Sequence, residues 1–405
     1  MADFAQNGII GTLHNLRYRT TEELDHDLKE FGRDRPMALV LPCLFSELEG
    51  PALGAIVDKL CEVPYLEEII IGLDRADASQ YEQAQKFFDR LPQRKVILWN
   101  DGPRLMNVNA RLDELGLAPK EPGKGRNVWY CLGYFLAAGR CQAVGLHDCD
   151  ILTYERDMLA RLLYPIVHPS FNYVFCKGYY YRAAGGKLNG RVVRLLVTPL
   201  LRALQLTIGQ NDYLDYMGSF RYPLAGEFSM RAEVVPSLRI PSDWGLEIGT
   251  LSEMYRNYSH HRICQVDIAD AYDHKHQPVS PDNPQGGLHR MSVDICKALI
   301  RKLAVNGKVF SPEVFRTLKA SYYRAALDMI DHYCNDATMS GLTLDRHTEE
   351  ATVELFSQAL MNAGEQFLRD PHSAPFIPNW ARVVSACPDI FEMITDAVNE
   401  DNAAA

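Results

Sequence analysis

The 405-residue sequence has no apolar run that approaches the roughly 20 residues needed to cross a lipid bilayer as a helix. The N-terminal stretch, Met1 to Gln6, has neither the basic region nor the apolar region of a secretory signal. Both absences argue against a membrane-bound or secreted protein. We therefore expect a soluble, cytoplasmic protein with no membrane partner.

Positive charge is in short supply. The chain has 42 Lys and Arg residues against 52 Asp and Glu residues, which gives a formal net charge of −10. Binding to nucleic acid or to an anionic membrane surface needs clustered Lys and Arg side chains. We therefore exclude both as main partners, and any anionic substrate must be met by a few local donors, a metal ion or helix ends.

The ten cysteines form no Cys-x-x-Cys pair, and no two are closer in sequence than Cys141 and Cys149. This spacing fits neither a zinc site nor a compact disulfide framework. Several of the cysteines lie in apolar stretches, where a free thiol behaves as a small hydrophobic side chain. The pattern is typical of a protein from a reducing compartment.

The first half of the chain alternates apolar runs with stretches of helical spacing. The apolar runs have the continuous character of strands that are buried on both faces. A polar loop of about twenty residues, which ends at 121–126, follows the third run, and long loops in compact domains are often functional. This order predicts an α/β fold of the Rossmann-like class, with a mostly parallel sheet. The predicted strands are 37–44, 67–73, 95–99, 144–150 and 173–181, and the predicted helices are 51–63, 79–91, 127–139 and 192–206, the last one bent at Pro199.

The character of the sequence changes near Gly287, where β-branched runs give way to helical periodicity. We expect an N-terminal arm over 1–36, an α/β domain over 37–286 and a helical C-terminal region over 287–405. This last region would pack on the sheet domain or on another subunit. Its predicted helices are 291–305, 312–334, 347–363 and a shorter one near 386–398.

The stretch Val144 to Ile151 is an apolar run that stops at two carboxylates, Asp148 and Asp150. Successive side chains of an extended chain point to opposite faces, so this pair would leave the strand end on the same side. Together the two carboxylates could hold Mg²⁺, which prefers oxygen ligands and substrate phosphates. The motif is short, and the alternative is a strand that leaves for a solvated loop.

Two loops are candidates for binding a nucleotide. Gly123, Lys124 and Gly125 precede a predicted helix, where backbone N–H groups, a lysine charge and the helix N-terminus favour phosphate. The spacing is not that of a Walker A loop, and a surface turn is the alternative. The stretch Pro42 to Glu47 closes the first strand, where a nucleotide would meet the sheet, or where an ordinary strand-to-helix turn would lie.

Two further carboxylates, Glu227 and Glu247, interrupt apolar stretches at 222–228 and 242–249. A carboxylate in such a setting needs a partner or a role. The segment 273–276 adds His274, which could complete the shell of a cation or bind phosphate.

Taken in order, these motifs resemble those of the glucosyl-3-phosphoglycerate synthase family, and more distantly those of mannosylglycerate synthases. Both are retaining glycosyltransferases of the GT-A fold. The resemblance covers about residues 37 to 300 and depends on the order of seven short motifs. They are Pro42-Cys43-Leu44, Pro122-Gly123-Lys124-Gly125, Asp148-Cys149-Asp150, Gly190-Arg191-Val192, Pro223-Leu224-Ala225-Gly226-Glu227, Gly245-Leu246-Glu247-Ile248-Gly249 and His274 with Pro278.

The resemblance implies a metal-dependent transfer of glucose from UDP- or GDP-glucose to 3-phospho-D-glycerate. It implies Mg²⁺ or Mn²⁺ on Asp148, Asp150 and His274, with Asp150, Glu227 and Glu247 at the reacting centre. It also implies a homodimer. The implied donor-binding residues are Pro42, Cys43, Leu44, Glu47, Asp74 (or Asp77), Lys124 and Asp148, and the implied acceptor-binding residues are Gly190, Arg191, Val192, Val193 and His276.

Val193 and His276 stand where the family tends to carry Thr and Asn. They keep open a mannosyl donor or free D-glycerate as acceptor, which would make the chain a mannosylglycerate or glucosylglycerate synthase. A non-catalytic sugar-nucleotide sensor on the same fold is another alternative. A nucleotidyltransferase would need a glycine-rich first loop, and Pro42 to Glu47 has no glycine.

Overall fold

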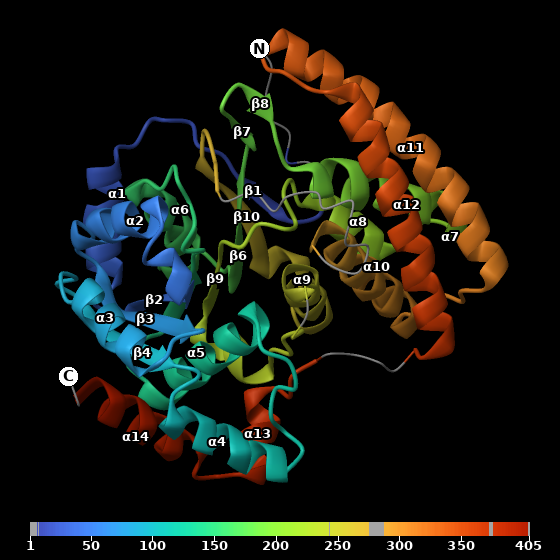
Figure 1. Ribbon diagram of the computed structural model, residues 1–405. Helices are drawn as coiled ribbons and strands as arrows, with labels where there is room; N and C mark the ends of the chain where they lie inside the picture. Colours follow the sequence, from blue (N-terminus) through green and yellow to red (C-terminus); the bar gives the residue numbers. More distant parts are fainter. Residues whose placement is uncertain (1–5, 7, 243, 275–286, 372–375, 404–405) are drawn as a thin grey trace.

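The computed structural model describes residues 6, 8–242, 244–274, 287–371 and 376–403 (Figure 1). An eight-stranded sheet runs through its centre in the order β1-β10-β6-β9-β5-β2-β3-β4. Its neighbours pair in parallel except β9, which is antiparallel to both β5 and β6. The strands are β1 (Gly11–Leu13), β2 (Met37–Leu44), β3 (Leu66–Asp74), β4 (Arg94–Trp99), β5 (Ala143–Leu146), β6 (Phe175–Tyr180), β9 (Phe228–Arg231) and β10 (Ile263–Ala269).

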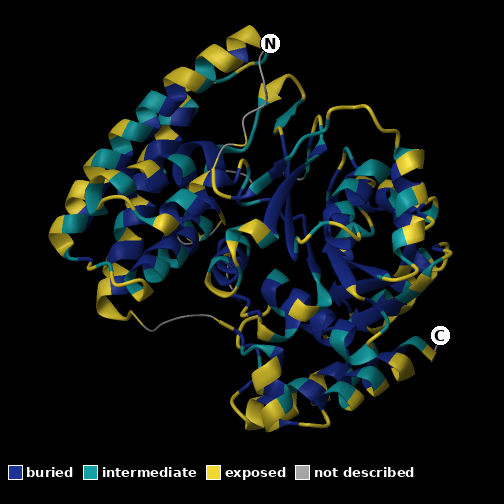
Figure 2. Cartoon of the chain, turned by 180° about the vertical axis from the view of Figure 1, so that it is seen from behind, coloured by how far each residue is buried: buried dark blue, intermediate teal, exposed yellow. Residues whose placement is uncertain are grey.

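Helices cover both faces of this sheet. Side chains alternate along β2, so that Leu39 and Leu41 enter one core while Ala38 and Val40 enter the other. The first core is covered by α1 (Thr21–Phe31), α2 (Pro51–Cys61), α3 (Ala78–Phe88) and α6 (Arg156–Val167). The second is covered by α4 (Pro103–Glu114), α5 (Lys124–Ala138), α7 (Thr198–Ile208), α8 (Asp212–Ser219) and α9 (Leu246–Asn257). Figure 2 shows that the strands are buried, whereas the outer sides of many surrounding helices are exposed.

The C-terminal helices join the second core. They are α10 (Gly287–Val305), α11 (Pro312–Met339), α12 (Arg346–Arg369), α13 (Trp380–Ala386) and α14 (Ile390–Ala403). The long helices α11 and α12 pack on each other and on the segment that leads into α7 (Figure 1). The last helix, α14, packs on α4 and α5 and closes the edge of the sheet, where the Asn402 side chain pairs with the backbone N–H and C=O of Ile97. The helical region therefore packs on the sheet of its own chain.

Three of the predicted elements differ from the structure. The polar loop after β4 contains α4, which begins at Pro103 and buries Leu105, Val108 and Leu112 at helical spacing. The last predicted helix, 386–398, corresponds to α14, which begins only at Ile390 because Pro388 disfavours helical geometry before it, and the short α13 was not predicted. The predicted strand 144–150 ends at Leu146, so that Asp148 and Asp150 lie in the turn that follows.

Smaller elements complete the fold. Gly11–Leu13, within the predicted N-terminal arm, pairs with β10 as an edge strand. The predicted helix 192–206 begins as a π-helix, η2 (Val192–Val197), and Pro199 lies in the first turn of α7. The other elements are the hairpin β7 (Ala183–Ala184) and β8 (Lys187–Leu188) and the short 3₁₀ helices η1 (Phe45–Glu47), η3 (Ala232–Ser237) and η4 (His260–Arg262). No helix among the described residues is long and apolar enough to span a membrane.

A buried aspartate in α1 should make stability depend on pH. Asp25 is buried beside Arg156, with 3.2 Å between Asp25 Oδ2 and Arg156 Nε, and its Oδ1 has no hydrogen-bond partner among the described residues. Burial raises the pKa of Asp25 to about 6, whereas an unfolded chain releases this proton near its ordinary value of about 4. Between these two values the folded protein holds the extra proton, so the free energy of unfolding falls as the pH rises.

We expect Asp25→Asn to remove this pH dependence. Relative to the wild type, the variant should gain about 2 kcal/mol of stability between about pH 4 and about pH 8, since each pKa unit is worth about 1.4 kcal/mol and part of the effect is already present at pH 4. Urea unfolding at the two pH values measures the difference, and Asp58→Asn, at an exposed position on α2, controls for the loss of one carboxylate. A difference that is the same at both pH values would contradict the assignment.

Candidate active site

The two acidic residues lie at the carboxyl end of β5, beside the start of α5. Asp148 Oδ1 is 2.6 Å from Lys124 Nζ, and Lys124 is the first residue of α5. The chain enters this helix through Gly123, whose φ of +150° is rare for residues with a side chain. On the other side of Asp148, a Cβ on Gly226 would come within 2.2 Å of Asp148 Oδ2. Only glycine therefore lets the segment before Glu227 approach the acidic pair so closely.

Lys124 joins the acidic pair to Glu247. Its Nζ lies 3.3 Å from Glu247 Oε1, and Glu247 is in the first turn of α9. Burial alone would lower the pKa of Lys124, but the charges of Asp148 and Glu247 outweigh it and raise that pKa. Burial likewise raises the pKa of Asp148, and Lys124 more than compensates, so that this pKa falls below its ordinary value. The lysine and Asp148 are therefore both charged at neutral pH.

Asp150 is in a different electrostatic position. Burial, followed by the charge of Asp148, raises the pKa of Asp150 to about 7. Its Oδ2 lies 4.0 Å from His274 Nδ1, and the other ring nitrogen, Nε2, is 2.7 Å from Arg182 Nη1. A guanidinium group can only donate, so His274 Nε2 accepts this hydrogen bond. The ring that faces Asp150 therefore carries no proton on Nε2.

Glu227 is fully buried one strand away. Its two carboxylate oxygens accept hydrogen bonds from the hydroxyls of Tyr180 (2.9 Å) and Tyr272 (2.7 Å), whose rings stack 3.6 Å apart. Burial, and then the charge of Asp148, raise the pKa of Glu227. The buried Lys177 donates to the carbonyl of Ala225 and so supports the same segment, and burial lowers the pKa of Lys177 to about 8.

The predicted donor loop follows β2. Pro42, Cys43 and Leu44 are its last residues, and Glu47 lies in η1. Asp74, at the end of the neighbouring strand β3, accepts a hydrogen bond from Asn100 Nδ2 (2.8 Å) and is buried.

Arg126, in the first turn of α5, lies 3.4 Å from Asp74 and 3.2 Å from Asp101. Asp77, by contrast, caps α3, because its side chain accepts from the N–H of Gln80 (2.9 Å). Asp74 and Arg126 therefore lie at the carboxyl end of β3, beside the predicted donor loop, while Asp77 has a structural partner.

The predicted acceptor loop lies before η2. Gly190 has a φ of +78°, and its neighbour Asn189 donates through its backbone N–H to the carbonyl of Arg182 (2.6 Å). Arg191 Nε donates to Glu349 Oε1 of α12 (3.0 Å). Val192 is partly buried and packs against the second core, and Val193 is buried. His276 lies outside the described residues.

The sequence analysis missed four side chains that line these groups. Arg182, Tyr180 and Tyr272 surround Glu227 and His274, and Lys177 lies beneath the Ala225 carbonyl. Only the Lys177 position gave a local signal, as a lysine inside an otherwise uncharged predicted strand. The others depend on contacts between segments that are far apart in sequence.

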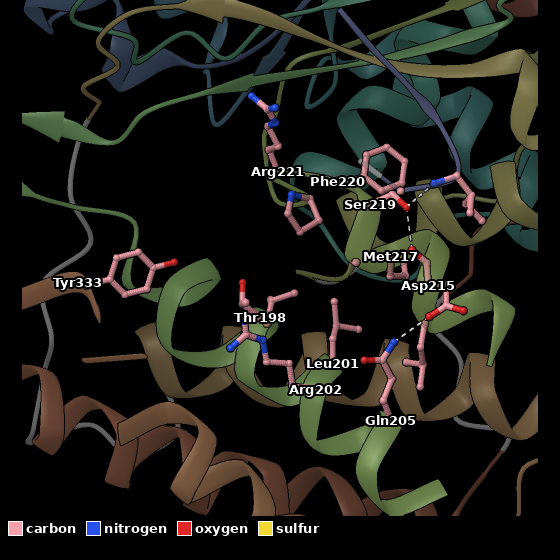
Figure 3. Close-up of a pocket in the computed structure, with 16 residues that line it drawn as sticks. Thr198, Leu201, Arg202, Gln205, Asp215, Met217, Ser219, Phe220, Arg221 and Tyr333 are labelled. Carbon is pink, nitrogen blue, oxygen red and sulfur yellow. Dashed lines mark hydrogen bonds between the residues drawn. The ribbon is translucent and has the colours of Figure 1, made fainter. Parts of the chain in front are cut away.

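Two cavities lie near the predicted acceptor loop and the helices that follow it. One, of about 410 Å³, lies between β8, Arg191 and the N-terminal end of α12. The other, of about 610 Å³, lies between α7, α8 and the segment 217–223, and Figure 3 shows Arg221, Thr198, Arg202 and Tyr333 around it. The described lining of the larger cavity contains none of the predicted site residues.

The described residues contain no group of three or more His, Cys, Asp or Glu side chains arranged to hold a metal ion. The donor types nevertheless fit a hard cation, because Asp148 and Asp150 supply carboxylate oxygens and His274 a ring nitrogen. Burial and then the charge of Asp148 raise the pKa of Asp150, and a cation would favour the charged form of both carboxylates. Lys124 pairs with Asp148 and Glu247 at the same place.

No protein-family profile matches the chain, but full-length relatives do. The chain is 44% identical to a glucosyl-3-phosphoglycerate synthase of Persephonella marina, over the full length of both. It is 36% identical to that of Methanococcoides burtonii, over 98% of each chain.

The fold also matches a crystal structure of glucosyl-3-phosphoglycerate synthase from Mycobacterium tuberculosis in complex with Mn²⁺, UDP-glucose and phosphoglyceric acid. The TM-score is 0.53 at 22% identity, over 73% of this chain and 88% of that one. This likeness confirms the predicted GT-A architecture, and the full-length relatives confirm the predicted resemblance. The chain belongs to the glucosyl-3-phosphoglycerate synthase family of glycosyltransferases.

Proposed function

We propose that this glycosyltransferase takes glucose from UDP-glucose and transfers it, with retention, to the hydroxyl group of 3-phosphoglycerate. The observation that carries the proposal is the meeting of Lys124, Asp148, Asp150, Glu247 and His274 at the carboxyl end of the sheet. Ligands of open α/β sheets bind at this edge. The choice of donor and acceptor is supported by the ligands named for the Mycobacterium tuberculosis structures.

Asp148, Asp150 and His274 would hold a divalent cation, Mn²⁺ or Mg²⁺. Solved structures of the Mycobacterium tuberculosis protein contain either ion together with UDP. When bound, the cation supplies positive charge to the diphosphate as it leaves. Lys124, which pairs with Asp148, would also be able to bind the diphosphate when a cation neutralises the Asp148 carboxylate.

The donor would lie along the ends of β2 and β3. Lys124 and the N-terminus of α5 face the diphosphate, since helix N-termini and lysines favour phosphate. Pro42, Cys43, Leu44 and Glu47 border the nucleoside, and Asp74 is placed for its base or ribose. Arg126 Nη2 lies 3.4 Å from Asp74 Oδ1 and so helps to position the Asp74 carboxylate.

The reaction breaks the bond between the glucose C1 and the diphosphate oxygen and forms a bond between C1 and the acceptor oxygen. The acceptor hydroxyl attacks from the side that the diphosphate leaves, and its proton passes to the departing phosphate oxygen. Two observations favour this front-side course over a protein nucleophile. Both oxygens of Glu227 are held by tyrosines, and Glu247 is paired with Lys124. Glu247 then contacts the sugar hydroxyls or steadies positive charge at C1.

The acceptor would bind at the Gly190–Val193 loop, with its anionic end on Arg191, and His276 is a further proposed contact. A planar guanidinium can meet a phosphate or carboxylate with two parallel hydrogen bonds. Since the Val193 side chain is buried, this residue can contribute only backbone groups to an acceptor. A cytoplasmic location and a homodimer complete the proposal, and light scattering of the purified full chain tests the latter.

A product screen tests the reaction and its metal requirement. Purified protein with Mn²⁺ should convert UDP-glucose and 3-phosphoglycerate into glucosyl-3-phosphoglycerate, detected by mass spectrometry. The product should disappear on addition of EDTA and return with excess Mn²⁺, because the diphosphate cannot leave without the cation.

The same screen offers GDP-glucose and GDP-mannose as donors and free glycerate as acceptor. Product from free glycerate alone would assign the chain to the glucosylglycerate or mannosylglycerate synthases. Donor binding without product from any pair would favour a sugar-nucleotide sensor and overturn the proposal.

A further inference from the structure

The acceptor loop meets the C-terminal helical region at one buried carboxylate. Glu349, in the first turn of α12, is only 1% exposed. Its Oε1 accepts from Arg191 Nε at 3.0 Å, and its Oε2 accepts from Arg194 Nη1 at 2.7 Å. Removing a carboxylate from water is energetically costly unless it has close cationic partners. The partners of Glu349 are Arg191 of the acceptor loop and Arg194 of η2.

The two arginines are held to very different degrees. Arg194 is buried, donates to the backbone carbonyls of Asn189 (2.8 Å) and Leu188 (3.4 Å), and lies over the ring of Tyr333 in α11. The Arg191 side chain is 37% exposed, and Glu349 is its one partner among the described residues. Glu349 thus holds Arg191 through the Arg191 Nε, and Arg194 holds the Glu349 carboxylate in place. The two terminal nitrogens of Arg191 have no partner within the described chain.

Arg191 also lines the cavity of about 410 Å³ introduced above. Lys187 and Asn189 line the same cavity from the hairpin side, and Thr343, Asp345 and Thr348 line it from the α12 side. The two sides are joined by the backbone, because Thr343 N–H donates to the carbonyl of Gly186 (2.8 Å). Two carboxylates also line the cavity, and both have partners: Asp345 caps α12 by accepting from the His347 N–H (3.1 Å), and Glu349 is paired with Arg191 and Arg194. The cations that the cavity offers to an anionic ligand are Lys187 and Arg191.

The loop that carries Arg191 is connected to the acidic pair. Asn189 donates to the backbone of Arg182, and Arg182 Nη1 lies 2.7 Å from His274 Nε2. His274 in turn lies 4.0 Å from Asp150. Hydrogen bonds therefore connect the loop that carries Arg191 to His274, which lies beside the acidic pair.

We infer that α12 completes the acceptor site, with Glu349 as a positioning residue that orients Arg191 toward an anionic group of the acceptor in the cavity beside Lys187. The inference rests on the proposed function, since it takes Arg191 as the residue that binds the acceptor anion. Two parallel hydrogen bonds require a fixed guanidinium plane, and a bond at Nε fixes that plane without using the terminal nitrogens. The phosphate and the carboxylate of 3-phosphoglycerate share the chemistry that this site would recognise.

The test is Glu349→Gln in the full chain, with steady-state kinetics for both substrates. We expect the KM for 3-phosphoglycerate to rise about tenfold while the KM for UDP-glucose stays within about twofold, because only the acceptor contact is disturbed. Glu350→Gln is the matched control, since it removes the same charge one residue along α12 from a side chain paired with Arg346. An unchanged acceptor KM in Glu349→Gln would overturn the inference. A lowered acceptor KM would also overturn it, because Glu349 would then compete with the acceptor for Arg191.

A second comparison separates positioning from a general structural role. In an Arg191→Lys background, which has no Nε donor, Glu349→Gln should raise the acceptor KM by less than about twofold more. A full tenfold additional loss there would mean that Glu349 acts on the fold and not through Arg191. If Glu349→Gln does not fold, Lys187→Ala tests the inference instead. Lys187 lines the same cavity and is exposed on β8, so its replacement should not disturb folding. It should raise the acceptor KM about threefold or more, with Lys319→Ala on α11 as control, and no change would overturn the inference.

Calorimetric titration of the same proteins with 3-phosphoglycerate separates this inference from the proposed reaction. Binding to the wild type that weakens about tenfold in Glu349→Gln supports the inference even if no product forms. Product formation with equal binding to both proteins keeps the proposed function and overturns the role of Glu349. A wild type that does not bind 3-phosphoglycerate overturns both.

Discussion

Replacing Asp150 by alanine, or Asp148 by alanine, should lower turnover by about a thousandfold or more, which corresponds to about 4 kcal/mol of lost transition-state stabilisation. Both residues are proposed to hold the cation that receives the charge of the leaving diphosphate. Asp150 should be the more sensitive of the two. Asp148 is also paired with Lys124, and in Asp148→Ala this lysine would still be paired with Glu247. Initial rates with saturating Mn²⁺ measure the effect.

The fold should survive either substitution. Both residues lie after β5 and not in a strand. Burial raises the pKa of Asp150 to about 7, so its charged form is not a source of stability, whereas Asp148→Ala removes the ion pair with Lys124 and should cost some stability without unfolding the protein. Near-ultraviolet circular dichroism checks the fold, and Asp270→Ala, on an exposed aspartate paired with Arg17, is the control for losing one carboxylate. Full activity in either site variant would rule out the proposed metal ligands.

Trp380→Ala should destabilise the protein by about 3–5 kcal/mol, the range for removing a large buried aromatic side chain. Trp380 is 1% exposed and stacks on Trp129 of α5 with ring centroids 4.0 Å apart. The two segments also exchange hydrogen bonds, from Trp380 Nε1 to the Trp129 carbonyl (3.1 Å) and from Trp129 Nε1 to the Pro378 carbonyl (2.8 Å). Gly133 leaves the space for the ring, since a Cβ there would come within 2.1 Å of it.

Urea unfolding measures this loss as a lower midpoint at an unchanged slope. Trp244→Ala removes a tryptophan of the same size that is 46% exposed, and it should change the free energy of unfolding by less than about 1 kcal/mol. A loss below about 1 kcal/mol in Trp380→Ala would show that α13 is not required to hold α5. Because α5 begins at Lys124, a severe loss of packing here should also weaken donor binding.

Local sequence was enough for the strands and helices with strong, continuous patterns. The buried strands β2, β3 and β4 and the long helices α11 and α12 agree closely with their predicted ranges, because apolar runs and helical spacing are local properties. The weaker signals failed for identifiable reasons. Polar residues on the outer side of α4 hid three buried positions, and Pro388 delays the start of the last helix to Ile390.

The acidic pair illustrates the difference between finding residues and placing them. The spacing of Asp148 and Asp150 identified both, but the strand geometry assumed for them was wrong, since the strand ends at Leu146. The pair lies together with Lys124 and Glu247 because Gly123 and Gly226 allow two loops to approach, and the positive φ of Gly123 was not evident from the sequence. The order of the motifs was enough to predict the family. The ion pairs that balance the charges of the site could be found only in the tertiary structure.

What the sequence by itself determined is the fold class, the family and the titratable groups on which the chemistry depends. These follow from periodicity, motif order and residue type, which are properties of the chain read along its length. Only the tertiary structure decided that Glu349 of α12 pairs with Arg191 and Arg194, that Arg182 reaches His274, and that two tyrosines hold Glu227. The physical reason is that each of these contacts joins residues that are 45 to 158 positions apart in the sequence. A buried charge takes its partner from whichever segment packs against it.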